Sequence, residues 1–115
     1  MYITLTLGVL LQTQGKLNLA EPFLRRALEG FERTLGRDHR HTLTSVGNLG
    51  QLLFAQGKLD LAEPFYRRAL EGHERTLGRD HSDTLTSVNN LGGLLKAQGK
   101  LSHAEPFYRR SLEGR

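Results

Sequence analysis

Apolar residues recur along the chain with the spacing of helices rather than of strands. The segment 85–98 is one example. Val88, Leu91 and Leu95 follow one another there at i, i+3 and i+7, and Leu94 widens the stripe. No segment of useful length alternates apolar and polar residues as a half-buried strand does. The pattern therefore predicts an all-α chain.

A longer helix is predicted from about Leu59 to Leu77, where the apolar residues form a broad face. This face consists of Leu61, Ala62, Phe65, Tyr66, Ala69, Leu70 and Leu77. Pro64 fits the helix if Asp60 is its N-cap, because the missing N–H of a proline costs little in the first turn. A turn of two or three residues joins this helix to the preceding one, so the two are expected to be antiparallel neighbours.

Short polar and glycine-rich segments predict where the helices end. Gly78 ends the helix over residues 59–77, and residues 79–83 form the connection to the next helix. Asp83 is expected to cap that helix, since a side-chain oxygen can accept a free N–H of the first turn. Gly99 is expected to end it in the left-handed conformation.

These helices belong to a repeat of 42 residues. The triplet GKL begins at Gly15, Gly57 and Gly99. Segments 15–56 and 57–98 are identical at all but eight of 42 positions. The differing pairs are Asn18/Asp60, Leu24/Tyr66, Phe31/His73, Arg40/Ser82, His41/Asp83, Gly47/Asn89, Gln51/Gly93 and Phe54/Lys96. Residues 1–14 and 99–115 are partial copies. The repeat predicts one array over residues 1–115, in which each unit buries its apolar face on its neighbour.

Glycines recur in phase inside both predicted helices of a unit. Gly50 and Gly92 lie within the first helix, where glycine costs about 1 kcal/mol relative to alanine. Their recurrence predicts close approach by the paired helix. Gly30 and Gly72 lie in the second helix, and the sequence alone does not explain them.

Several of these positions resemble the tetratricopeptide repeat. The matching residues are Leu49, Gly50, Leu53, Gly57, Ala62, Tyr66 and Ala69. The 42-residue period resembles the kinesin light chain form of the repeat, through segments 62–64, 68–71, 77–81, 84–85, 89–91 and 98–100. The resemblance implies a right-handed superhelical solenoid of about three antiparallel helix pairs that binds other proteins and is not an enzyme. No segment resembles the motor-binding heptads of kinesin light chain, so a motor role is not implied.

The two full copies predict where a partner would bind. Their first helices differ at positions 40, 47, 51 and 54, along one stripe that faces away from Leu49 and Leu53. The resemblance assigns this stripe to a concave peptide-binding groove. The predicted groove residues are Thr44, Gly47, Asn48, Gln51, Phe54, Thr86, Asn89, Asn90, Gly93 and Lys96. Asn48 and Asn90 match the family asparagine that reaches the main chain of a peptide, and Lys96 favours an acidic one. Drift on a solvated face is the alternative explanation.

Other chemistry is weakly supported by the sequence. Arginine pairs such as Arg67-Arg68 recur once per unit, but glutamates at i, i+4 spacing satisfy them and no aromatic platform accompanies them, so we expect no nucleic-acid binding. His39 and His81 lie in connections without further ligands, and we expect them to cap turns rather than hold a metal. We also expect no catalytic residues, no cofactor and no membrane contact.

Composition and the two ends of the array add two expectations. The chain has 115 residues, a formal net charge of +4 and no cysteine. The lack of cysteine excludes disulfides and favours a reducing, cytoplasmic location. The first helix starts with exposed apolar residues such as Tyr2 and Ile3, so we expect self-association through an exposed solenoid end. The equal alternative is that the chain is a fragment of a longer array, in which a further unit covers the exposed end. The near-identity of the copies also fits an alternative function, that of a structural, self-assembling spacer without a dedicated ligand.

Overall fold

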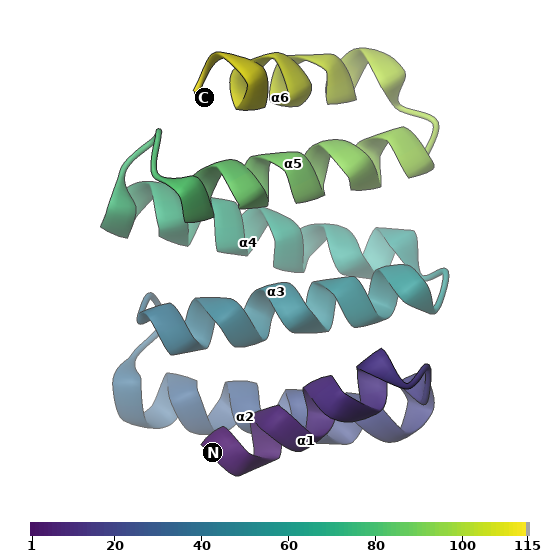
Figure 1. Ribbon diagram of the computed structural model, residues 1–115, viewed down its shortest axis with the longest axis vertical. Helices are drawn as coiled ribbons and strands as arrows, with labels where there is room; N and C mark the ends of the chain where they lie inside the picture. Colours follow the sequence, from purple (N-terminus) through teal and green to yellow (C-terminus); the bar gives the residue numbers. More distant parts are fainter. Residues whose placement is uncertain (115) are drawn as a thin grey trace.

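The computed structural model describes residues 1–114, which form six α-helices and no strand (Figure 1). The helices are α1 Tyr2–Thr13, α2 Leu17–Leu35, α3 Arg40–Ala55, α4 Leu59–Leu77, α5 Ser82–Ala97 and α6 Leu101–Glu113. Turns of three residues join α1 to α2, α3 to α4 and α5 to α6. Figure 1 shows these pairs stacked along the long axis, from the purple N-terminal pair to the yellow C-terminal helix. The predicted all-α solenoid of three helix pairs is confirmed.

One continuous core runs through the stacked pairs. The first helices supply fully buried residues at equivalent positions, such as Leu49 in α3 and Leu91 in α5. The second helices contribute Ala62 and Tyr66 from α4, at the positions of Ala20 and Leu24 in α2. Helix α3 packs against both α2 and α4, so each pair covers the apolar face of the next, as the repeat predicts.

The recurring GKL triplet is explained by the turn inside each pair. Gly15, Gly57 and Gly99 have φ values of +78°, +79° and +79°, a region that disfavours residues with a Cβ atom. The following Lys58 donates its N–H to the carbonyl of Leu53 at 2.9 Å, which closes the end of α3. The predicted left-handed stop at Gly99 is confirmed.

The sequence Gly-Arg-Asp-His forms both connections between pairs, at residues 36–39 and 78–81. Gly78 has a φ of +90° and ends α4. Its carbonyl accepts a hydrogen bond of 2.8 Å from the Thr84 hydroxyl, which ties the connection to the next helix. The first copy repeats this bond from Thr42 to Gly36 at 2.7 Å.

The predicted N-cap of α5 is wrong. Helix α5 begins at Ser82, so the connection is residues 78–81, and His81 rather than Asp83 is its N-cap. The imidazole Nδ1 of His81 accepts the N–H of Asp83 at 3.1 Å, and an imidazole nitrogen can fill the place of a carboxylate oxygen because it also has a free lone pair. His39 caps α3 in the same way, so the expected capping role of the two histidines is confirmed.

The expected first-turn position of Pro64 is also wrong. The N-cap of α4 is Lys58, whose carbonyl accepts the first intrahelical bond from Ala62 at 3.0 Å. Pro64 is therefore the sixth residue of α4, in its second turn. Its missing N–H leaves the carbonyl of Asp60 without an intrahelical donor. Asp60 and Pro64 are both exposed, so water can hydrate that carbonyl.

The glycines inside the helices make room for side chains of neighbouring helices. A Cβ atom at Gly50 would lie 3.0 Å from the ring of Tyr66 and 3.3 Å from Cβ of Phe65, so the predicted close approach of α4 is confirmed. At Gly72 a Cβ would lie 2.5 Å from Cδ2 of Leu43. Gly72 of α4 thus makes room for the large apolar residue near the start of α3, the other helix of its pair.

Candidate functional site

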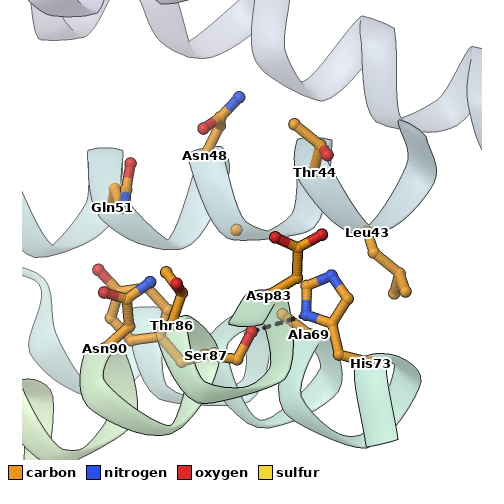
Figure 2. A pocket seen from close by; sticks show the side chains of 12 residues that line it. Leu43, Thr44, Asn48, Gln51, Ala69, His73, Asp83, Thr86, Ser87 and Asn90 are labelled. Atoms are coloured by element: carbon orange, nitrogen blue, oxygen red, sulfur yellow. Dashed lines mark hydrogen bonds between the residues drawn. The ribbon is translucent and has the colours of Figure 1, made fainter. Parts of the chain in front are cut away.

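The clearest candidate site is a cavity of about 200 Å³ between α3 and α5, with α4 as its floor (Figure 2). Helix α3 contributes one wall and α5 the other. The lining residues are Leu43, Thr44, Gly47, Asn48 and Gln51 from α3, Tyr66, Ala69 and His73 from α4, and Asp83, Thr86, Ser87 and Asn90 from α5. The walls are mainly polar, whereas the floor is mainly apolar.

The polar groups of the walls are suited to recognising a chain through hydrogen bonds. Asn48 lies on one wall and Asn90 on the other, and each amide can both donate and accept. Asp83 is exposed, and its carboxylate makes no hydrogen bond or ion pair within residues 1–114. In Figure 2 this carboxylate points from α5 toward α3, beside the ring of His73. A ligand could therefore pair with it without displacing a protein partner.

His73 and Ser87 form the one hydrogen bond drawn among the lining residues in Figure 2. The Nδ1 atom of His73 lies 2.7 Å from the Ser87 hydroxyl. Burial lowers the pKa of His73, although the Asp83 carboxylate opposes this effect, so the imidazole is neutral at pH 7. Ser87 lies within α5, where backbone N–H groups are used in helical bonds and cannot form an oxyanion hole. The pair is better suited to shaping the cavity than to nucleophilic catalysis.

The equivalent place one unit earlier is filled by aromatic side chains. There Tyr2 lies 5.1 Å from Phe31 and 5.0 Å from His41, measured between ring centroids. The cavity has Thr44 at the position of Tyr2, His73 at that of Phe31 and Asp83 at that of His41. Smaller and more polar residues thus open a space that the first unit closes.

The structure brings together six of the ten predicted groove residues around this cavity. They are Thr44, Gly47, Asn48, Gln51, Thr86 and Asn90. The other four, Phe54, Asn89, Gly93 and Lys96, do not line it. Phe54 and Lys96 lie in the last turns of α3 and α5, and Lys96 lines a separate hollow with residues of α6.

Sequence reasoning missed His73, Asp83 and Ser87 as members of this site. His73 and Asp83 stand at two of the eight positions that differ between the copies, so the copy comparison contained the signal. His73 was missed because only differences on the first helix were taken as groove positions, and Asp83 because it was assigned to the cap of that helix. Ser87 is the same in both copies and carried no such signal.

Within residues 1–114, carboxylates engage five of the six arginines of the recurring pairs, all but Arg26. Arg67 bonds Glu63 at 2.8 Å within α4. Its neighbour Arg68 reaches Glu32 of α2 at 2.6 Å. Arg75 pairs with Asp38, in the connection between α2 and α3, at 3.0 Å. The guanidinium of Arg75 holds the pKa of the Asp38 carboxyl below its usual range. These pairs link neighbouring units rather than form a free basic ladder.

Among residues 1–114, the structure shows no group of side chains suited to a metal ion. Nowhere in this part of the chain do three His, Asp or Glu side chains gather closely enough to hold one. None of the six helices is both long and apolar enough to cross a membrane.

The family model described as tetratricopeptide repeat matches residues 1–74 and 46–115, and the two matches together span the chain. The chain belongs to the tetratricopeptide repeat family. Proteins of this family are generally non-catalytic scaffolds for protein–protein interaction. No curated protein sequence matches this tetratricopeptide array.

Solved structures resemble the tetratricopeptide array along nearly its whole length. BtubC (BKLC) from P. vanneervenii is 26% identical, with a TM-score of 0.92 over 98% of this chain and 44% of that one. A putative kinesin light chain of Podosopora anserina with nearly identical repeats is 21% identical, with a TM-score of 0.85 over 96% of this chain and 52% of that one. The resemblance to kinesin light chain repeats is thus confirmed for the fold. The chain spans about half the length of these structures.

Proposed function

We propose that the chain is an interaction scaffold that binds a peptide segment of a partner protein along α3 and α5. The observation that carries this proposal is the polar cavity between these two helices, with Asn48 on one wall and Asn90 on the other. Neither asparagine is fully buried. A peptide in an extended conformation exposes unpaired N–H and C=O groups, and an amide side chain can satisfy both. We assign no reaction to the chain.

We further propose that the groove continues toward the last turn of α5 and there favours an acidic residue. Lys96 is exposed and makes no ion pair within residues 1–114. Its counterpart in the preceding unit is Phe54, which is also exposed but carries no charge. The preference for an acidic residue therefore belongs to the unit that contains Lys96. The attraction to Lys96 is that of an exposed charge and weakens with salt.

The double variant Asn48→Ala, Asn90→Ala tests the binding proposal. We expect it to lose capture of peptides from an array of extended acidic and basic sequences, because the asparagine amides of both walls are removed. Its melting temperature should stay close to that of the wild type. Gln14→Ala removes an exposed amide outside the cavity and is the matched control. Capture of the same peptides by the double variant would contradict the proposal.

Self-association is the second candidate function, and the exposure of matched residues favours it. Leu112 of α6 is 78% exposed, whereas its counterpart Leu70 in α4 is 7% exposed under α5. Tyr108 and Tyr66 differ in the same sense, at 39% and 6%. At the other end of the stack, Ile3 and Leu10 of α1 are exposed. A second copy of the chain would cover these faces, and the chain would then act as a self-assembling spacer. Separately, we propose a cytoplasmic location, because the chain has no cysteine.

A further inference from the structure

The cavity between α3 and α5 has a charge that the proposed peptide groove does not by itself explain. Asp83 is the one carboxylate among its lining residues, and no lysine or arginine lines it. The first unit has His41 at this position, packed against Tyr2. The negative charge is therefore a property of this one place in the array rather than a requirement of the repeat.

The groups around Asp83 leave it available to a ligand. His73 from α4 is bonded to Ser87 and is neutral at pH 7, because burial lowers its pKa. Arg40 and Asp38 line the neighbouring hollow toward the start of α3, together with Asp83. The carboxylate of Asp38 is held by Arg75. No cation within residues 1–114 pairs with Asp83 itself.

The size and lining of the cavity fit one long side chain. Its volume of about 200 Å³ is below the roughly 300–1,000 Å³ of sites for drug-sized ligands. Asn48, Gln51 and Asn90 are among its lining residues, and each amide oxygen can accept a hydrogen bond. The apolar floor at Ala69 can cover a methylene stem. A guanidinium carries five N–H donors in a plane and suits such a set of oxygens.

We propose that this cavity binds an arginine side chain of the partner peptide, with Asp83 as its counter-ion. The inference rests on the proposed peptide groove and adds the chemistry of one bound residue. It does not conflict with the acidic preference of Lys96, because Asp83 and Lys96 lie at opposite ends of α5. The preferred peptide therefore carries a basic and an acidic residue at separate positions.

The test uses a small probe that needs no knowledge of the partner. N-acetyl-arginine amide is titrated into the isotope-labelled chain and followed by NMR, with N-acetyl-citrulline amide as the neutral probe of the same shape. We expect the arginine probe to shift the amide signals of Asp83, Ser87 and Asn90 and the citrulline probe to bind at least threefold more weakly. Asp83→Asn should weaken arginine binding roughly two- to fivefold, as expected for a partly exposed ion pair.

A matched variant separates the local charge from the net charge. Asp60→Asn makes the same charge change at a position that does not line the cavity, and asparagine is the residue of the first copy there. It should bind the arginine probe as the wild type does. Equal binding of the two probes, or equal effects of Asp83→Asn and Asp60→Asn, would overturn the inference. The peptide groove would stand or fall separately, by the capture experiment on Asn48 and Asn90.

Discussion

At the scale of single residues, one exchange between copies changes both packing and chemistry. Phe31 of the first unit is fully buried, and the buried hydroxyl of the adjacent Ser45 has no hydrogen-bond partner. In the second unit His73 replaces Phe31 and satisfies the hydroxyl of Ser87. The Ser87 hydroxyl can donate to a bare Nδ1 or accept from a protonated one, so this bond forms in either neutral tautomer of His73. The exchange therefore gives the second unit a partly buried imidazole, and burial favours its neutral form over its charged form.

His73 should make stability depend on pH. Its pKa in the folded chain is lowered by burial from the usual value of 6.5, so the unfolded chain binds more protons in the window just below pH 6.5. Stability is therefore lost as the pH falls through 6.5 toward the lowered value. His73→Phe, which places the first copy's residue there, should flatten this loss in thermal melts between about pH 7 and 5.

His103→Leu is the control for the histidine experiment. His103 is exposed, and leucine occupies the equivalent position in the second unit. This variant should keep the pH dependence of the wild type. An unchanged slope in His73→Phe would show that other groups cause the acid sensitivity.

At the scale of helices, the sequence predicted the repeat and the second helices well and the caps poorly. The boundaries of α4 at Leu59 and Leu77 are as predicted, because a broad apolar face and Gly78 define them. The N-cap of α5 was assigned to Asp83 rather than to His81, because asparagine, aspartate, serine and threonine are the usual N-caps and the expected capping by His81 was assigned to the turn. The role of Gly72 could not be read from its own helix, because it depends on Leu43 of another.

Two glycines of α3 should respond in opposite ways to alanine. A Cβ atom at Gly47 meets nothing within 4 Å, so Gly47→Ala should gain up to about 1 kcal/mol of helix propensity. At Gly50 the same atom meets the buried ring of Tyr66 and Cβ of Phe65, which is fixed to its backbone. Gly50→Ala should therefore be destabilising. Urea unfolding of the two variants measures the difference, and equal midpoints would contradict this account of the packing.

At the scale of the whole molecule, equivalent positions of the repeat have different surroundings in different units. Six of the predicted groove residues converge on one cavity because period and helix phase, both readable in the sequence, fix their positions. The cavity itself could not be predicted, because it depends on how Thr44, His73 and Asp83 together fail to fill a space that Tyr2, Phe31 and His41 fill one unit earlier. The volumes of side chains on three helices together decide whether the cavity forms, so the sequence of one helix alone cannot predict it.

The series Leu7→Ala, Leu49→Ala and Leu91→Ala tests how coverage by neighbours sets stability. These leucines occupy one repeat position, but Leu49 and Leu91 are fully buried, whereas Leu7 is 38% exposed. Leu49→Ala and Leu91→Ala should each lower the free energy of unfolding by about 2–5 kcal/mol. Leu7→Ala should lower it clearly less, because part of the Leu7 side chain is already exposed to water. Urea unfolding at two protein concentrations about tenfold apart measures each cost. If a second copy covers α1, the cost at Leu7 will rise with concentration and sedimentation will show an oligomer. A small cost that is independent of concentration, with the sedimentation of a monomer, would contradict self-association through this helix.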